Sequence, residues 1–172
     1  FCEISPTTYK ISLKKENLKR HIQNFKQGKK FSKIRQEKIL PNLVSSYSTQ
    51  LIKRGPGIDI TLQKGKATNI QIASKNLNNI IIHPGEEFSF WSLVGNTTKK
   101  KGYQEGRVIV NGKVEPDIGG GLCNLANLLH LLIVHSPMEI TEFHSHSDAL
   151  DPDKGTRKPF ANGTSVQYNH QD

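Results

Sequence analysis

The sequence has few cysteines and no long hydrophobic runs. Only Cys2 and Cys123 occur in 172 residues, whereas small disulfide-built domains use several cysteine pairs. A disulfide framework is therefore excluded, although a single Cys2–Cys123 bridge stays open. No apolar run approaches the ~20 residues of a membrane-spanning helix, and no signal peptide is visible after Phe1. The compartment is left open, with a cell-envelope association as one option.

Acidic residues are scarce at the start of the chain. Residues 1–50 contain 11 lysines and arginines against three acids, so they carry +8 of the formal net charge of +9. Such a segment can contact an anionic polymer or surface, or it can be a solvated helix face. It has neither interleaved aromatic residues nor a nucleic-acid-binding motif, so nucleic acid is not expected as a partner.

Hydrophobic periodicity predicts the order of the elements. A thin apolar stripe predicts one or two helices over 11–40, broken near Gly28, and helical spacing recurs over 67–80. Alternation predicts short strands at 58–62, 87–90, 138–143 and 164–168. A hairpin is expected from 106–110 and 113–115, because Asn111-Gly112 is a strong two-residue turn.

Three consecutive glycines lead directly into Cys123, and the residues after it are apolar as far as Val134. Glycines allow a sharp turn, and the apolar segment predicts a buried helix that Pro137 closes. A thiol at a helix start lies beside unpaired N–H groups and the positive end of the helix dipole. Both favour the thiolate, which is the nucleophilic form. From the residues alone, Cys123 is a nucleophile, a buried structural cysteine or a metal ligand.

Two histidines, His144 and His146, follow the strand that is predicted after this helix, and on a strand they would share a face. A base within hydrogen-bond reach can take the thiol proton; His146 is the preferred base and His144 the second choice. A zinc-dependent hydrolase with Cys123, His144 and His146 as ligands is a weaker alternative, because the paired spacing of zinc ligands is missing. No metal or cofactor is therefore assigned.

These elements predict a single α+β domain. A mixed or antiparallel sheet would pack on the buried helix that Cys123 heads. The order of a cysteine at a helix start and then a histidine at a strand end is that of papain-like and transglutaminase-like enzymes. No internal repeat or second domain is visible.

Several sequence blocks from about Leu40 onward resemble the VanW family, which is named for a protein found in some vancomycin-resistance gene clusters. The blocks are 84–91, Val94-Gly95 with Thr98, Gly102-Tyr103 with Gly106, 119–123 and 142–147. The resemblance assigns residues 40–172 to a VanW-like domain. Residues 1–39 then form a basic helical N-terminal segment.

The resemblance also implies a function, because VanW domains in some longer wall proteins have been linked to L,D-transpeptidation. It implies a cell-wall protein linked to glycopeptide resistance, with cysteine-dependent acyl transfer on peptidoglycan stem peptides or their precursors. By position, Cys123 would be the nucleophile and His146 the base. Substrate or oxyanion binding would fall to Gly119, Gly120, Gly121, Leu122, Asn124, Tyr103 and Trp91.

Some positions depart from the family pattern. Asn124 stands where the family usually has glutamine, and Phe143 where it commonly has arginine. Gly163 stands opposite a family aspartate that could orient the histidine, so the third site residue is not assigned. These departures leave open, as the alternative, a non-catalytic module that binds peptidoglycan or a partner protein.

Overall fold

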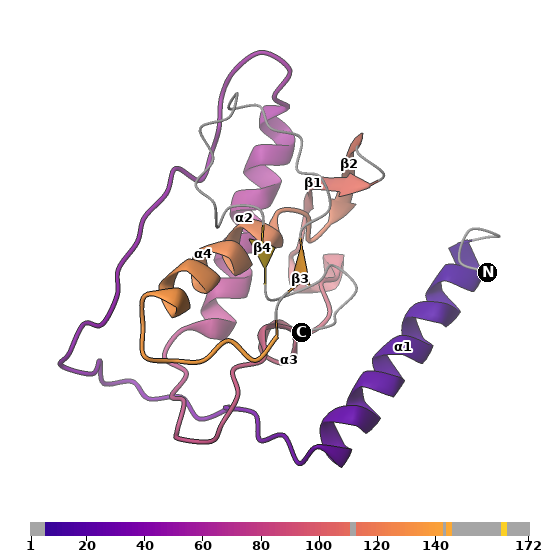
Figure 1. The fold of residues 1–172 in the computed structure, drawn as a ribbon. Helices are drawn as coiled ribbons and strands as arrows, with labels where there is room; N and C mark the ends of the chain where they lie inside the picture. Colours follow the sequence, from indigo (N-terminus) through magenta and orange to yellow (C-terminus); the bar gives the residue numbers. More distant parts are fainter. Residues whose placement is uncertain (1–5, 111–112, 143, 146–162, 165–172) are drawn as a thin grey trace.

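The computed structural model describes residues 6–110, 113–142, 144–145 and 163–164 (Figure 1). The helical elements are α1 (Pro6–Lys26), α2 (Ile60–Leu77), α3 (Phe90–Val94), the 3-10 helix η1 (Lys99–Lys101) and α4 (Leu122–Val134). The strands are β1 (Glu105–Val110), β2 (Lys113–Ile118), β3 (His144–Ser145) and β4 (Gly163–Thr164). The described residues therefore have an α+β fold, with two small antiparallel sheets in place of the single sheet that the sequence predicted.

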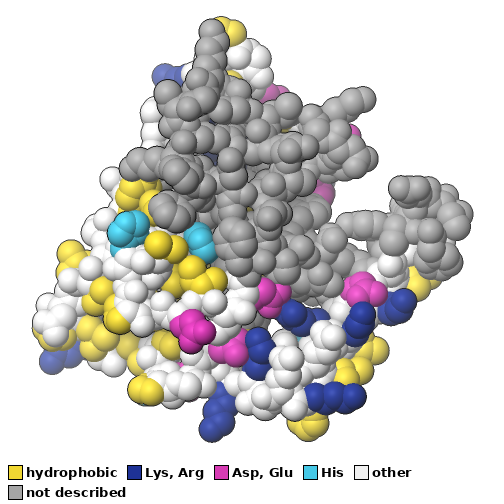
Figure 2. All heavy atoms as spheres, in the orientation of Figure 1, with side chains coloured by type: hydrophobic (Ala, Val, Ile, Leu, Met, Phe, Trp, Pro, Cys, Tyr) yellow, Lys and Arg dark blue, Asp and Glu magenta, His cyan; other side chains and the backbone are white. Residues whose placement is uncertain are grey.

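The basic N-terminal segment contains one long helix, α1, and Figure 2 shows lysine and arginine side chains gathered along it. The helix ends at Lys26, and residues 29–36 continue as an extended strap. The N–H of Ser32 donates to the carbonyl of Glu87, and the N–H of Ile81 donates to the carbonyl of Ile34, each at 2.9 Å. Because these backbone groups pair with 79–87, the second of the two helices allowed by the periodicity does not form.

The central helix of the described fold is α2. Its N-cap is Asp59, whose carboxylate accepts from the N–H of Thr61 at 2.7 Å and from that of Leu62 at 3.3 Å. The prediction of a strand over 58–62 is wrong, because this carboxylate satisfies N–H groups that a helix start leaves without partners. The helix predicted over 67–80 is confirmed; it begins at Ile60 and ends at Leu77.

The hairpin of β1 and β2 packs directly on α2. A Cβ atom at Gly65 of α2 would collide with the backbone carbonyl of Glu105, so helix and strand approach to backbone contact. The strands pair antiparallel, with Glu105 opposite Ile118 and Val110 opposite Lys113. The predicted hairpin is confirmed, with a longer second strand, and its Asn111-Gly112 turn lies outside the described residues.

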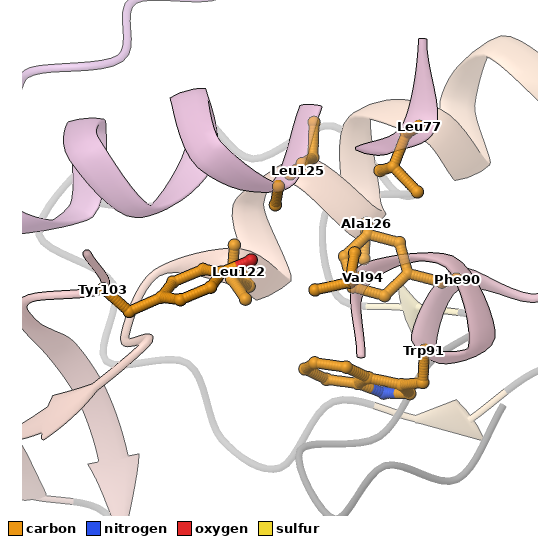
Figure 3. Close-up of a cluster of buried hydrophobic side chains, with 9 residues drawn as sticks. Leu77, Phe90, Trp91, Val94, Tyr103, Leu122, Leu125 and Ala126 are labelled. Carbon is orange, nitrogen blue, oxygen red and sulfur yellow. The ribbon is translucent and has the colours of Figure 1, made fainter. Parts of the chain in front are cut away.

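The hydrophobic core lies between α2, α3 and α4 (Figure 3). Its buried members are Ala73, Leu77, Phe90, Trp91, Val94, Tyr103, Leu122, Leu125 and Ala126. The rings of Phe90 and Trp91 meet edge to face with centroids 5.1 Å apart, an arrangement that aromatic pairs favour. The prediction of a strand over 87–90 is wrong, because the Ser89 hydroxyl accepts from the N–H of Ser92 and begins α3.

The predicted helix after the glycine run is confirmed as α4, which ends at Val134. The strand predicted over 138–143 is wrong for Met138–Glu142, which form no strand, and Phe143 lies outside the described residues. The chain instead enters β3 at His144, and β3 pairs with β4, which lies against α4. Of the strand predicted over 164–168, only Thr164 is described, as part of β4. Nowhere in the described ranges is a helix both long and apolar enough to cross a bilayer.

Candidate functional site

Cys123 is the second residue of α4 and is partly buried. The helix begins at the N-cap Gly121, whose φ of 92° lies in the left-handed region and which has no side chain to cap the helix. Its first N–H groups therefore lack the usual side-chain acceptor. Cys123 is a free thiol in the described part of the chain; Cys2, its partner in the bridge that the sequence left open, lies outside the described residues.

The protonation state of Cys123 differs from the sequence-based expectation. Burial raises the pKa of the Cys123 thiol above its ordinary value, while the N–H of the same residue lowers it by a smaller amount. The helix start favours the thiolate, as expected, but the net direction was wrong because desolvation is the larger effect. Burial therefore favours the thiol over the thiolate, and as a nucleophile Cys123 needs a base.

The glycine turn is fixed by backbone hydrogen bonds. The N–H of Gly119 donates to the carbonyl of Gln104, and the N–H of Gly120 donates to that of Asp117, each at 3.0 Å. Both N–H groups are thus already in use. An oxyanion site at this turn would have to use the N–H groups of Gly121, Leu122 and Cys123.

Asn69 of α2 holds this turn against the start of β1. Its side chain is fully buried, and its Nδ2 donates to the carbonyls of Gln104 and Gly120, each at 2.9 Å. Its Oδ1 accepts from the N–H of Gln104 at 2.8 Å. The sequence reasoning missed Asn69. The available signal was its spacing of four and eight residues from Ala73 and Leu77, which puts a polar side chain on the apolar face of the helix.

Close packing explains why the turn consists of glycines. A Cβ atom on Gly120 would collide with the carbonyl of Gly106, and one on Gly106 would collide with that of Gly120. A Cβ atom on Gly119 would meet the side chain of Thr97. Each position therefore approaches a neighbour too closely for any side chain.

Lys66 of α2 lies on the third glycine. A Cβ atom on Gly121 would overlap the aliphatic stem of Lys66, whose side chain is only 8% exposed. Burial, with smaller contributions from the positive charges of Lys53 and Arg107, lowers the pKa of Lys66. A buried cation therefore lies beside the start of α4, and the sequence reasoning had not singled it out.

Two of the residues predicted to contact substrate lie in the core. Tyr103 is 2% exposed and Trp91 is 9% exposed, and Figure 3 shows the Tyr103 ring beside Leu122. Burial raises the pKa of Tyr103, and no described residue hydrogen-bonds its hydroxyl. Asn124, by contrast, is exposed, and its N–H donates to the carbonyl of Gly121 at 3.0 Å.

The histidines predicted as bases are not placed by the described residues. The backbone of His144 belongs to β3, opposite Thr164; its side chain and all of His146 lie outside the described part. The pairing of Cys123 with either one therefore stays a prediction. His130, farther along α4, is buried, and burial lowers its pKa. Within the described ranges, no group of three histidine, cysteine or acidic side chains is placed to hold a metal ion.

Comparison with known proteins bears on the same region. The sequence profile described as VanW like protein matches residues 65–172. The chain is 38% identical over 110 residues to the vancomycin B-type resistance protein VanW of Enterococcus faecalis, across 64% of this chain and 40% of that protein. It is 28% identical over 113 residues to the uncharacterized protein YoaR of Bacillus subtilis, across 66% of this chain and 37% of that protein.

The matched stretch thus spans about two fifths of the length of these curated relatives. No solved structure matches the chain. Asn69, the glycine turn and Cys123 all fall within the region that the family profile covers, which is more than half of the chain. This chain belongs to the VanW family.

Proposed function

We propose that this chain is the VanW-like part of a cell-wall protein that acts in glycopeptide resistance by cysteine-dependent acyl transfer on peptidoglycan stem peptides. The link to resistance rests on the similarity to a vancomycin resistance protein. The observation that carries the chemistry is the position of Cys123, one residue into α4 and directly after a turn that Asn69 holds rigidly. A nucleophile on such a support keeps a fixed direction of attack.

In the proposed reaction, the Cys123 sulfur attacks the carbonyl of the diaminopimelate residue in a donor peptide. His146 takes the thiol proton and passes it to the amine of the departing D-Ala as the amide bond breaks, which leaves a thioester. An amine of a second stem peptide then attacks the thioester, and the Cys123 thiol is restored. Because its pKa is raised, Cys123 loses its proton only as the attack proceeds, by general-base catalysis.

The negative charge that develops on the attacked carbonyl oxygen also needs stabilisation. The N–H groups of Gly121, Leu122 and Cys123 lie at the positive end of α4 and would supply it. The N–H groups of Gly119 and Gly120 would not, because they already donate to backbone carbonyls. The hydrogen bonds of Gly119 and Gly120 instead fix the turn, and the turn orients the N–H groups of the three residues that follow.

The test is a reaction of the purified protein with a donor tetrapeptide and an acceptor stem peptide, followed by mass spectrometry. We expect a thioester adduct on Cys123 and a 3-3 cross-linked product. Cys123→Ala should abolish both, whereas Cys2→Ala, the matched control at the other cysteine, should retain both. Equal product from the Cys123→Ala variant would overturn the proposal.

A non-catalytic binding module is the second candidate, and the pairing of β3 with β4 favours it. Gly163 lies opposite Ser145, next to His144 in sequence. The family aspartate at this position would therefore stand on the strand that neighbours the histidine strand, where this chain has no carboxylate. Tight peptide binding by both the native protein and the Cys123→Ala variant, with no thioester on either, would establish this alternative.

A further inference from the structure

Lys66 lies beside the glycine turn, and two cationic residues from other segments, Arg107 and Lys53, act on its charge. Lys66 comes from α2, and Arg107 comes from β1, which packs on α2 through Gly65. Lys53 precedes α2, and its N–H donates at 3.3 Å to the side chain of Gln63, one helical turn before Lys66. Burial lowers the pKa of Lys66, and the charges of Lys53 and Arg107 lower it further, so both charges lie within electrostatic range of Lys66.

Lys66 is the buried one of these three cations. Its stem lies on Gly121, and its side chain is 8% exposed. No residue in the described ranges forms a hydrogen bond or ion pair with its Nζ, and the same is true of the Arg107 guanidinium. Glu105, the acid nearest to Arg107 in sequence, pairs with Lys99 instead, at 3.7 Å. Buried cations are ordinarily paired, so Lys66, with Arg107 near it, is suited to an anion from outside the described fold.

We propose that Lys66, together with Arg107 and Lys53, binds the C-terminal carboxylate of the peptide on which Cys123 acts. This inference rests on the proposed function, which brings that peptide to Cys123. The carboxylate of the departing D-Ala is separated from the leaving nitrogen by a single carbon atom. The stem of Lys66 lies against Gly121, two residues before Cys123, so in this proposal its charge would meet a carboxylate close to the attacked bond. Charge-assisted hydrogen bonds would then neutralise the buried lysine.

The test uses the full chain with Cys123→Ala, so that binding is measured without turnover. A tetrapeptide with a free C-terminal carboxylate and the same peptide with a C-terminal amide are titrated and followed by NMR. We expect the free acid to bind about 10- to 100-fold more tightly, as for hydrogen bonds to charged groups. Lys66→Met keeps the stem over Gly121 and removes the charge, so it should remove this preference without weakening amide binding.

Lys64→Met is the matched control, because Lys64 is exposed on the same helix; it should leave the preference for the free acid unchanged. Arg107→Met should reduce that preference and provides a readout that does not depend on packing within α2. Equal affinities for acid and amide, or equal losses in the Lys66 and Lys64 variants, would overturn the inference.

The two proposals can fail separately. A preference for the acid that depends on Lys66, in a protein whose native form makes no thioester, supports the carboxylate site and defeats acyl transfer. If the native protein transfers the acyl group but binds the free-acid and amide peptides equally well, the proposed reaction is supported and the proposed carboxylate site is wrong.

Discussion

At the scale of single residues, Lys66 links the candidate site to stability. Its lowered pKa means that the unfolded chain binds this proton more tightly than the folded chain does. Stability therefore rises as the pH rises from the lowered pKa towards the ordinary value of 10.5. We expect Lys66→Met to raise the Tm at pH 7, and the gain should shrink as the pH approaches 10.5.

Thermal unfolding at a series of pH values, with Lys64→Met beside Lys66→Met, measures this difference. Effects of other titrating groups cancel in the comparison, because both variants share them. A Tm that falls by the same amount at every pH in the Lys66 variant would mean that the charge of Lys66 is already paired in the folded protein.

Asn69 is the residue on which the shape of the glycine turn depends most. Its replacement by alanine removes the partners of the Gln104 N–H and of the Gly120 carbonyl, whereas the Gln104 carbonyl keeps the N–H of Gly119. Unpaired buried groups of this kind cost about 1–3 kcal/mol each. We expect Asn69→Ala to lower the free energy of unfolding by about 2 kcal/mol or more in urea titrations.

Gln71→Ala provides the control for Asn69→Ala, because Gln71 is exposed on the same helix. It should change the free energy of unfolding by less than about 0.5 kcal/mol, as surface substitutions usually do. A loss of similar size in both variants would show that Asn69 contributes only as an ordinary helix residue.

At the scale of elements, sequence patterns predicted the structure correctly where an apolar run was long or where two residues formed a specific turn motif. The apolar run after Cys123 and the Asn111-Gly112 dipeptide predicted α4 and the hairpin correctly. Alternation over 58–62 and 87–90 failed, because four or five residues with period two also fit a helix start. In both cases a single cap, Asp59 or Ser89, decides for the helix.

The contacts that build the site were less predictable than the elements. The glycine run and Cys123 were recognised as a turn and a helix start from the sequence. Asn69 and Lys66 lie more than 50 residues earlier in the chain, and only the packing of α2 brings them to the turn. Likewise, the net pKa of Cys123 follows from burial, which a local pattern does not encode.

Because α2 and β1 are in close contact, we expect a Gly→Ala substitution at this contact to lower stability rather than raise it. In an exposed helix interior, Gly→Ala stabilises by roughly 0.5–1 kcal/mol. At Gly65 the new Cβ atom would collide with the Glu105 carbonyl, so we expect Gly65→Ala to destabilise the protein by about 1–3 kcal/mol, the usual cost of overpacking. Urea unfolding measures this, with exposed Lys75→Ala on the same helix as the control. A stabilised Gly65→Ala variant would show that the two elements separate easily.

At the scale of the whole molecule, the strap at 29–36 crosses the boundary that the sequence predicted between residues 39 and 40. The strap exchanges backbone hydrogen bonds with the segment 79–87, inside the region that the family profile covers. Ser32 is 1% exposed, and Lys29 pairs with Glu87 at 2.9 Å. The helix α1 differs from the strap in how it is joined to the rest of the chain: an ion pair between the side chains of Arg20 and Glu142 connects them. From the contacts of the strap we predict a boundary near Gly28 instead.

Two truncations distinguish these boundaries. Removal of residues 1–28 leaves the strap in place, so we expect a Tm close to that of the full chain. Removal of residues 1–39 also deletes the backbone bonds with 79–87, each worth about 0.5–1.5 kcal/mol net. The shorter protein should therefore unfold several degrees lower in calorimetry, since each kcal/mol shifts the Tm of a chain of this size by roughly 2–4 °C. Equal Tm values for both truncations would instead support the boundary at residue 39 and show that the strap contributes little to the fold around Cys123.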